Sequence, residues 1–96
     1  MKATPVNHVK VHDERGNIVE IRMWQVSPAP DKPHGYKYSL VYIVNGVRAI
    51  GYDNGEGQGD HRHFGNQQQP YNFTTLKQLA RDFLADIETW KREHPQ

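Results

Sequence analysis

The chain has no cysteine among its 96 residues. Disulfide bonds, thiolate metal sites, redox chemistry and a cysteine nucleophile are therefore excluded. Long hydrophobic runs are also missing, because nowhere do roughly 18 apolar residues follow one another as a membrane-spanning helix needs. Residues 1–5 lead into no apolar segment of the kind that a secretory signal contains. We therefore expect a cytoplasmic protein that does not associate with a membrane.

An excess of charge of one sign is lacking too. Twelve lysines and arginines stand against 11 aspartates and glutamates, which gives a net charge of +1 with the six histidines counted as neutral. The whole molecule therefore attracts polyanions weakly, and only local basic patches remain as binding surfaces. Hydrophobic residues make up 35% of the chain. A chain of this size and composition predicts one domain, residues 1–96, with a thin core that favours a partner covering part of its surface.

The signatures of several common enzyme classes do not occur. The chain has no P-loop, no dinucleotide-binding glycine motif and no serine-hydrolase elbow. The run from Asp53 to Asp60 resembles a calcium loop only superficially, because glycines occupy positions where an EF-hand places oxygen ligands and no glutamate closes it. We expect no cofactor.

Alternating apolar and polar residues predict a first β-hairpin over residues 9–26, with its turn at residues 13–17. We expect Val11 to lie opposite Val19, because this register also sets oppositely charged residues across from each other on the wet side. Trp24 then falls on the outer face of the sheet.

A second hairpin follows, with strands over residues 36–44 and 47–53 joined by a two-residue type I′ turn at Asn45 and Gly46. Its register can be counted from the turn. The pairs predicted in this way are Val44 with Val47, Tyr42 with Ala49, Leu40 with Gly51 and Tyr38 with Asp53.

The rest of the chain predicts a proline-rich connector at 27–35, a glycine-rich loop at 54–59, a short strand at 60–63 and a polar loop at 64–72. A helix capped by Thr75 completes the fold. Its expected core stripe is Leu76, Leu79, Ala80, Phe83, Ile87 and Trp90. The fold class is therefore α+β, a mainly antiparallel sheet of four to five strands packed against one C-terminal helix.

The densest group of chemically active side chains is Asp60-His61-Arg62-His63. In an extended chain His61 and His63 point to one face, and Asp60 and Arg62 to the other. Two neighbouring imidazoles can act as general base and acid on RNA, with an arginine on the phosphate. A metal site that uses Asp53 or Asp60 as a further ligand is a second interpretation, and ordinary polar surface residues are a third.

Aromatic and basic residues accompany the histidines. Tyr36, Lys37, Tyr38 and Tyr52 are candidates for binding RNA, by stacking on bases and by contact with phosphate. The alternative is that the tyrosines are ordinary residues of the sheet surface.

The chain resembles the TumE family, toxins of type II toxin–antitoxin systems that are usually encoded beside a helix-turn-helix antitoxin. The similarity runs from about Tyr36 to about Ile87. The segments that carry it are Arg48-Ala49-Ile50-Gly51-Tyr52-Asp53-Asn54, Gly59-Asp60-His61-Arg62-His63 and Pro70-Tyr71-Asn72-Phe73. The resemblance implies a toxin neutralised by a cognate antitoxin, and RNA cleavage is the usual activity of toxins of this size.

The leading hypothesis is therefore a toxin that cleaves RNA as a metal-independent endoribonuclease. His61 and His63 would be base and acid, Arg62 would bind the phosphate, and Asp53 or Asp60 would orient a histidine. The alternative is a non-catalytic module that binds RNA or a protein. We also expect a helix-turn-helix antitoxin to bind the surface around Trp24, Tyr36 and Tyr38.

Overall fold

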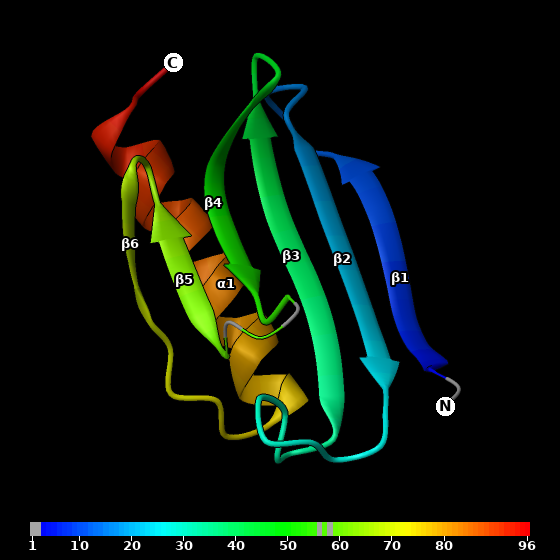
Figure 1. The fold of residues 1–96 in the computed structure, drawn as a ribbon. Coiled ribbons are helices and arrows are strands. Elements are labelled where there is room, and N and C mark those ends of the chain that lie inside the picture. Colours follow the sequence, from blue (N-terminus) through cyan, green and yellow to red (C-terminus); the bar gives the residue numbers. More distant parts are fainter. Residues whose placement is uncertain (1–2, 56, 58) are drawn as a thin grey trace.

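The computed structural model describes residues 3–55, 57 and 59–96. In this part of the chain six strands form one antiparallel sheet, in which each strand pairs with its neighbours in sequence, and one helix follows (Figure 1). The elements are β1 (Thr4–His12), β2 (Ile18–Gln25), β3 (Tyr36–Val44), β4 (Val47–Asp53), β5 (His61–Phe64), β6 (Gln67–Pro70) and α1 (Leu76–Glu93).

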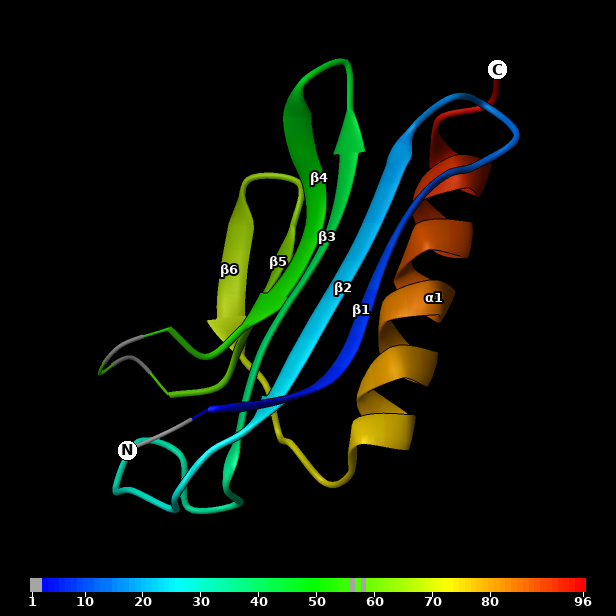
Figure 2. The same cartoon turned by 90° about the vertical axis from the view of Figure 1, so that its right-hand side faces the viewer.

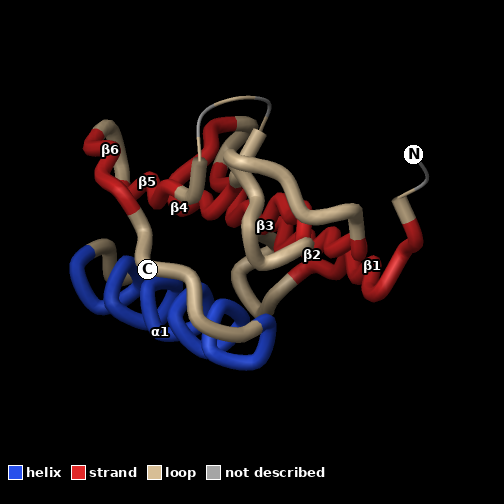
Figure 3. The backbone as a smooth tube through the Cα atoms, turned by 60° about the horizontal axis from the view of Figure 1, so that its bottom comes forward, coloured by secondary structure: helices blue, strands red, loops and turns tan. Residues whose placement is uncertain are grey.

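The molecule has two layers. The helix α1 lies along one face of the sheet, and among the described residues no second helix covers the opposite face (Figures 2 and 3). We call this opposite side the helix-free face. The core lies between the sheet and α1 and is formed by Met23, Tyr38, Leu40, Tyr42, Ala49, Ile50, Tyr52, Leu79, Phe83 and Ile87.

The α+β class predicted from the sequence is confirmed, with one strand more than the expected four to five. The extra strand is β6, which lies within the segment that the sequence predicted as a polar loop. Gly65 has a φ of 61° at the turn between β5 and β6, a conformation that glycine adopts without strain. The signal for this turn was the pair Gly65–Asn66, a common two-residue hairpin loop.

The first hairpin has the predicted register. Val11 pairs with Val19 and Val9 with Ile21, so Val19, Ile21 and Met23 pack against the core. Trp24 therefore lies on the helix-free face, as predicted, because side chains alternate along β2.

The second hairpin follows the prediction only at its turn. Asn45 and Gly46 have φ values of 52° and 76°, as a type I′ turn requires, and Val44 pairs with Val47. Ile43 still pairs with Arg48 in this register, but from Tyr42 on the predicted register is wrong by one residue, since Tyr42 pairs with Ile50 rather than Ala49. Ala49 is an extra residue, a β-bulge, and its carbonyl accepts a hydrogen bond from the backbone N–H of Gly65.

The bulge decides which residues of β4 face the helix. Leu40 pairs with Tyr52 instead of Gly51, and Asp53 pairs with Ser39 instead of Tyr38. Ile50 and Tyr52 therefore enter the core, whereas Gly51 and Asp53 lie on the helix-free face.

The helix begins as the sequence predicts. The Thr75 hydroxyl accepts a hydrogen bond of 3.0 Å from the backbone N–H of Gln78. The Gln78 side chain, however, donates to Asp82 instead of completing a capping box. All six residues of the predicted stripe pack in or against the core.

The predicted glycine-rich loop at 54–59 includes residues 56 and 58, which lie outside the described residues.

Candidate functional site

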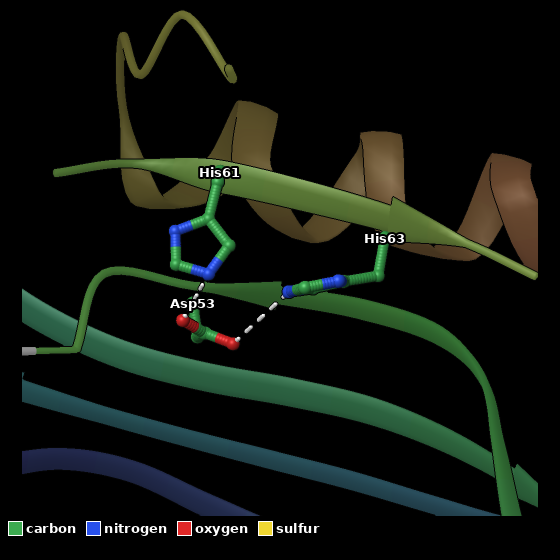
Figure 4. Close-up of side chains that lie close together, drawn as sticks. All are labelled: Asp53, His61 and His63. Carbon is green, nitrogen blue, oxygen red and sulfur yellow. Dashed lines mark ion pairs between the residues drawn. The ribbon is translucent and has the colours of Figure 1, made fainter. Parts of the chain in front are cut away.

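Strands β4 and β5 bring three polar side chains together on the helix-free face: Asp53, His61 and His63 (Figure 4). Asp53 pairs with His61 across the two strands, and His63 follows two residues later on the same face. The two imidazole rings lie 4.9 Å apart between centroids. The same-face placement predicted for the histidines is confirmed, and the bulge at Ala49 is what brings Asp53 to them.

His61 is held at both ring nitrogens by acceptors. Its Nε2 lies 2.8 Å from Oδ1 of Asp53, and its Nδ1 lies 3.1 Å from the carbonyl oxygen of Gly59. A carboxylate and a carbonyl accept hydrogen bonds but do not donate them. Each ring nitrogen of His61 therefore faces an acceptor, and the contact with Asp53 fixes the orientation of the ring.

His63, in contrast, has a hydrogen-bond donor at one of its ring nitrogens. The Arg48 guanidinium donates a hydrogen bond of 3.1 Å to its Nδ1, so this nitrogen carries a lone pair. Its Nε2 faces Oδ2 of Asp53 at 3.7 Å. Burial lowers the pKa of His63, the Arg48 charge and His61 lower it further, and Asp53 opposes them. His63 is therefore neutral at a pH where an ordinary histidine is partly charged.

Arg48 is the residue of this site that sequence reasoning missed. Its side chain crosses Gly51, where an added Cβ would lie only 2.8 Å from Arg48 Cδ. The absence of a side chain at Gly51 thus allows the guanidinium to reach His63. The predicted register hid this arrangement, because it set Gly51 on the face of Leu40, which is the helix side.

A metal ion is the other chemistry that three such ligands suggest. One ligand atom from each of Asp53, His61 and His63 lies within 4.8 Å of the others. The carbonyl contact of His61 Nδ1 suits a metal-binding histidine. The contact from Arg48 does not, because it leaves the proton of His63 on Nε2, the atom that would bind the metal. The observed hydrogen bonds therefore favour proton transfer over metal binding.

Arg62 lies on the opposite side of the sheet, as strand alternation requires. Its guanidinium forms two hydrogen bonds with Asp86 of α1, at 2.6 and 2.9 Å, and one with the Tyr52 hydroxyl. The hydrogen bonds to Asp86 raise the pKa of Arg62. The structure therefore does not bring Arg62 to the histidines, and its contacts join β5 to the helix.

Asp60 is also directed elsewhere. Its carboxylate accepts hydrogen bonds from the Tyr38 hydroxyl at 2.6 Å and from His34 at 3.0 Å. The ring of His34 stacks on Phe73, 3.9 Å away between centroids. Asp60 thus links His34 of the proline-rich loop to Tyr38 of β3 by hydrogen bonds. Asp53 is the carboxylate that contacts the histidines.

The four predicted RNA-binding residues are divided between the two faces. Tyr38 and Tyr52 are 1% and 2% exposed in the core, where burial raises the pKa of both hydroxyls. Tyr36 is half-buried and lies near the rings of His34 and Phe73. Lys37 alone is on the helix-free face, 5.7 Å above the ring of Trp24. The surface expected for an antitoxin around Trp24, Tyr36 and Tyr38 is therefore not continuous.

Fold and site together define a small α+β protein that carries an Asp-His-His-Arg cluster on the uncovered face of an antiparallel sheet. The family model described as Toxin TumE matches residues 3–91 of the chain. The chain therefore belongs to the TumE toxin family, which confirms the resemblance seen in its sequence. No curated protein and no solved structure matches it.

Membership of this family gives the protein the role of a toxin and implies, in general, an antitoxin as its partner. Among the described residues, no helix has the length and apolar character to cross a membrane.

Proposed function

We propose that this toxin cleaves RNA as a metal-independent endoribonuclease, with His63 as general base and His61 as general acid. Arg48 takes the phosphate-binding role that the sequence suggested for Arg62, because Arg48 contacts His63 whereas Arg62 lies on the other side of the sheet. Asp53 positions His61 through its contact with Nε2.

The observation that supports this proposal most is the contrast between two adjacent imidazoles. Both ring nitrogens of His61 face acceptors, one of them the Asp53 carboxylate, while burial and the Arg48 charge lower the pKa of His63. A pair of titratable groups whose surroundings favour opposite protonation states is typical of an acid and a base that work in one reaction.

The reaction uses both states. Nδ1 of His63 becomes available when the Arg48 guanidinium binds the scissile phosphate. His63 then takes the proton of the ribose 2′-hydroxyl, and the 2′-oxygen attacks the phosphorus. The bond to the 5′-oxygen breaks, and His61 gives its proton to that leaving oxygen. The products are a 2′,3′-cyclic phosphate and a 5′-hydroxyl end, and both histidines have exchanged their protonation states.

The proposal is tested by incubating the purified protein with end-labelled single-stranded RNA in EDTA. We expect cleavage that leaves cyclic phosphate ends. His61→Ala or His63→Ala should reduce the rate by roughly 10²- to 10⁴-fold, the usual contribution of a general acid or base. His12→Ala is the matched control, because His12 is an exposed histidine in β1. A shift in RNA mobility without cleavage would instead support the non-catalytic binding module.

We also propose that the antitoxin is a helix-turn-helix protein encoded beside the toxin, as the family resemblance suggests. Co-purification with the product of the adjacent gene tests this assignment. A neighbouring gene without such a motif, or one whose product does not bind, would contradict it.

A further inference from the structure

The helix-free face carries most of the positive charge of the sheet. Among the described strand residues, Lys10, Arg22, Lys37 and Arg48 lie on this face, and Arg62 is the one lysine or arginine on the helix side. The net charge of +1 for the whole chain therefore conceals a local basic surface.

The described strands carry two carboxylates on this face, Glu20 and Asp53, and both have partners. Glu20 contacts His8 at 3.2 Å and Arg22 at 3.0 Å. Asp53 contacts Nε2 of His61 at 2.8 Å. The described strand residues of this face thus carry four lysines and arginines against two carboxylates, and this positive excess suits a polyanion.

A path of small side chains joins the histidine cluster to the other end of this face. Arg22 pairs with Ser39, which pairs with Asp53. Since neighbouring strands lie about 4.8 Å apart, Arg22 stands about 10 Å from the Asp53 position across the sheet. Ser39 lies on this path and Gly51 lies beside it. Their side chains are too small to obstruct a ligand that extends from the histidine cluster to Arg22.

A pocket of about 340 Å³ lies at the far end of this path and is lined by Pro5, Asn7, His8, Arg22 and Trp24. Trp24 contributes a half-buried aromatic ring, and the Lys37 ammonium lies over this ring, 5.7 Å from its centroid. An aromatic ring flanked by cations is the arrangement with which proteins bind single-stranded RNA, because every base can stack and every phosphate is negative.

We propose that this pocket is a nucleotide-binding subsite, in which a base of single-stranded RNA stacks on Trp24 while Arg22 and Lys37 bind the adjacent phosphates. The inference builds on the proposed function, since it supplies a binding site for RNA that flanks the scissile phosphate. It assigns roles to Trp24 and Arg22, which lie outside the histidine cluster.

The test measures binding of a fluorescent single-stranded RNA by anisotropy in EDTA. The double variant His61→Ala/His63→Ala serves as the parent, so that cleavage does not interfere. In this parent, Trp24→Ala should weaken binding about 5- to 100-fold, the range measured for the loss of one stacked base. Trp24→Phe keeps an aromatic ring and should lose less RNA affinity than Trp24→Ala. It is also the control for a folding defect in the alanine variant.

Matched charge variants test the phosphate contacts. Arg22→Gln and Lys37→Gln should each reduce the slope of log binding constant against log salt concentration by about 0.7. Arg81→Gln and Lys77→Gln are the controls, because both residues are exposed on α1 and both changes remove the same charge. The controls should leave the affinity almost unchanged.

Unchanged RNA affinity in folded Trp24→Ala, or equal losses in the test and control charge variants, would overturn the inference. Loss of antitoxin binding without loss of RNA binding would assign the pocket to the protein partner and overturn it as well. If the wild-type protein binds RNA through Trp24 but does not cut it, the subsite stands and the proposed catalysis fails.

Discussion

At the residue scale, the functional assignment depends on what each charged side chain contacts. Asp60 and Arg62 stand next to His61 in the sequence, yet Asp60 binds Tyr38 and Arg62 binds Asp86. Asp60 and Arg62 therefore do not contact the histidine pair, although they adjoin His61 in the sequence. Arg48 and Asp53 are more distant in sequence, and they are the residues that contact the histidines.

Replacing Arg48 with methionine should change the pH dependence of cleavage. The base must be neutral, so kcat/KM falls as the pH drops through the pKa of His63, which lies below its ordinary value of about 6.5. Removing the Arg48 charge raises this pKa, and the acidic limb should move to higher pH. A profile of kcat/KM against pH in EDTA measures this. Arg81→Met should leave the limb in place, and an unmoved limb in Arg48→Met would contradict the role of His63.

Arg62 should matter for stability rather than for chemistry. Arg62→Ala leaves the Asp86 carboxylate, whose side chain is 15% exposed, without its cation. Breaking such a partly buried pair should lower the free energy of unfolding by about 2–3 kcal/mol, measured in urea. His63→Ala is the comparison and should change it far less. If Arg62→Ala were fully stable but could not cut RNA, Arg62 would belong to the chemistry.

At the element scale, the sequence predicts what depends on local pattern and misses what depends on a single inserted residue. The alternation in β2, the Asn45–Gly46 turn and the stripe of α1 all follow from side-chain periodicity, and the structure confirms them. The bulge at Ala49 has no such signal, because alanine fits either face of a strand. It shifts the face of every following residue of β4.

The bulge and the missing side chain of Gly51 together place Arg48 on His63. Gly51→Ala should leave stability within about 1 kcal/mol of wild type, because the clash involves an exposed, flexible arginine that can rotate away. Cleavage should nevertheless fall, because the displaced Arg48 guanidinium no longer binds the scissile phosphate beside His63. Rates in EDTA and urea unfolding of the same samples measure both effects.

Ser39→Ala is the control for Gly51→Ala, since Ser39 lies on the same face opposite Asp53. It should keep the wild-type rate. Full activity in Gly51→Ala would show that the Arg48 contact with His63 is dispensable.

At the scale of the whole molecule, the two faces of the sheet differ in role. The face covered by α1 forms the core, and the helix-free face carries the histidine cluster. The helix covers one side of the sheet (Figure 2), and strand register places the histidine pair and four of the five strand lysines and arginines on the other. The sequence alone indicated a thin core and weak net charge, but it could not show that the charge is divided by face, because this division depends on the register of all strands.

Binding of the antitoxin should stabilise this small fold. A partner present at 100 times its dissociation constant adds about 2.7 kcal/mol to the stability of the folded state, which corresponds to a rise in Tm of roughly 11–22 °C for a domain of this size. Thermal unfolding of the toxin alone and of the co-purified complex measures it. An unrelated helix-turn-helix protein at equal concentration is the control, and an unchanged Tm with the true partner would contradict the expectation.

The central claim is that the His61–His63 pair carries the toxic activity. Growth after induction of wild type and of His61→Ala/His63→Ala, at equal levels of folded protein, tests it most directly. We expect wild type to arrest growth and the double variant to be harmless, with His12→Ala as toxic as wild type. Full toxicity from the folded double variant would contradict the claim.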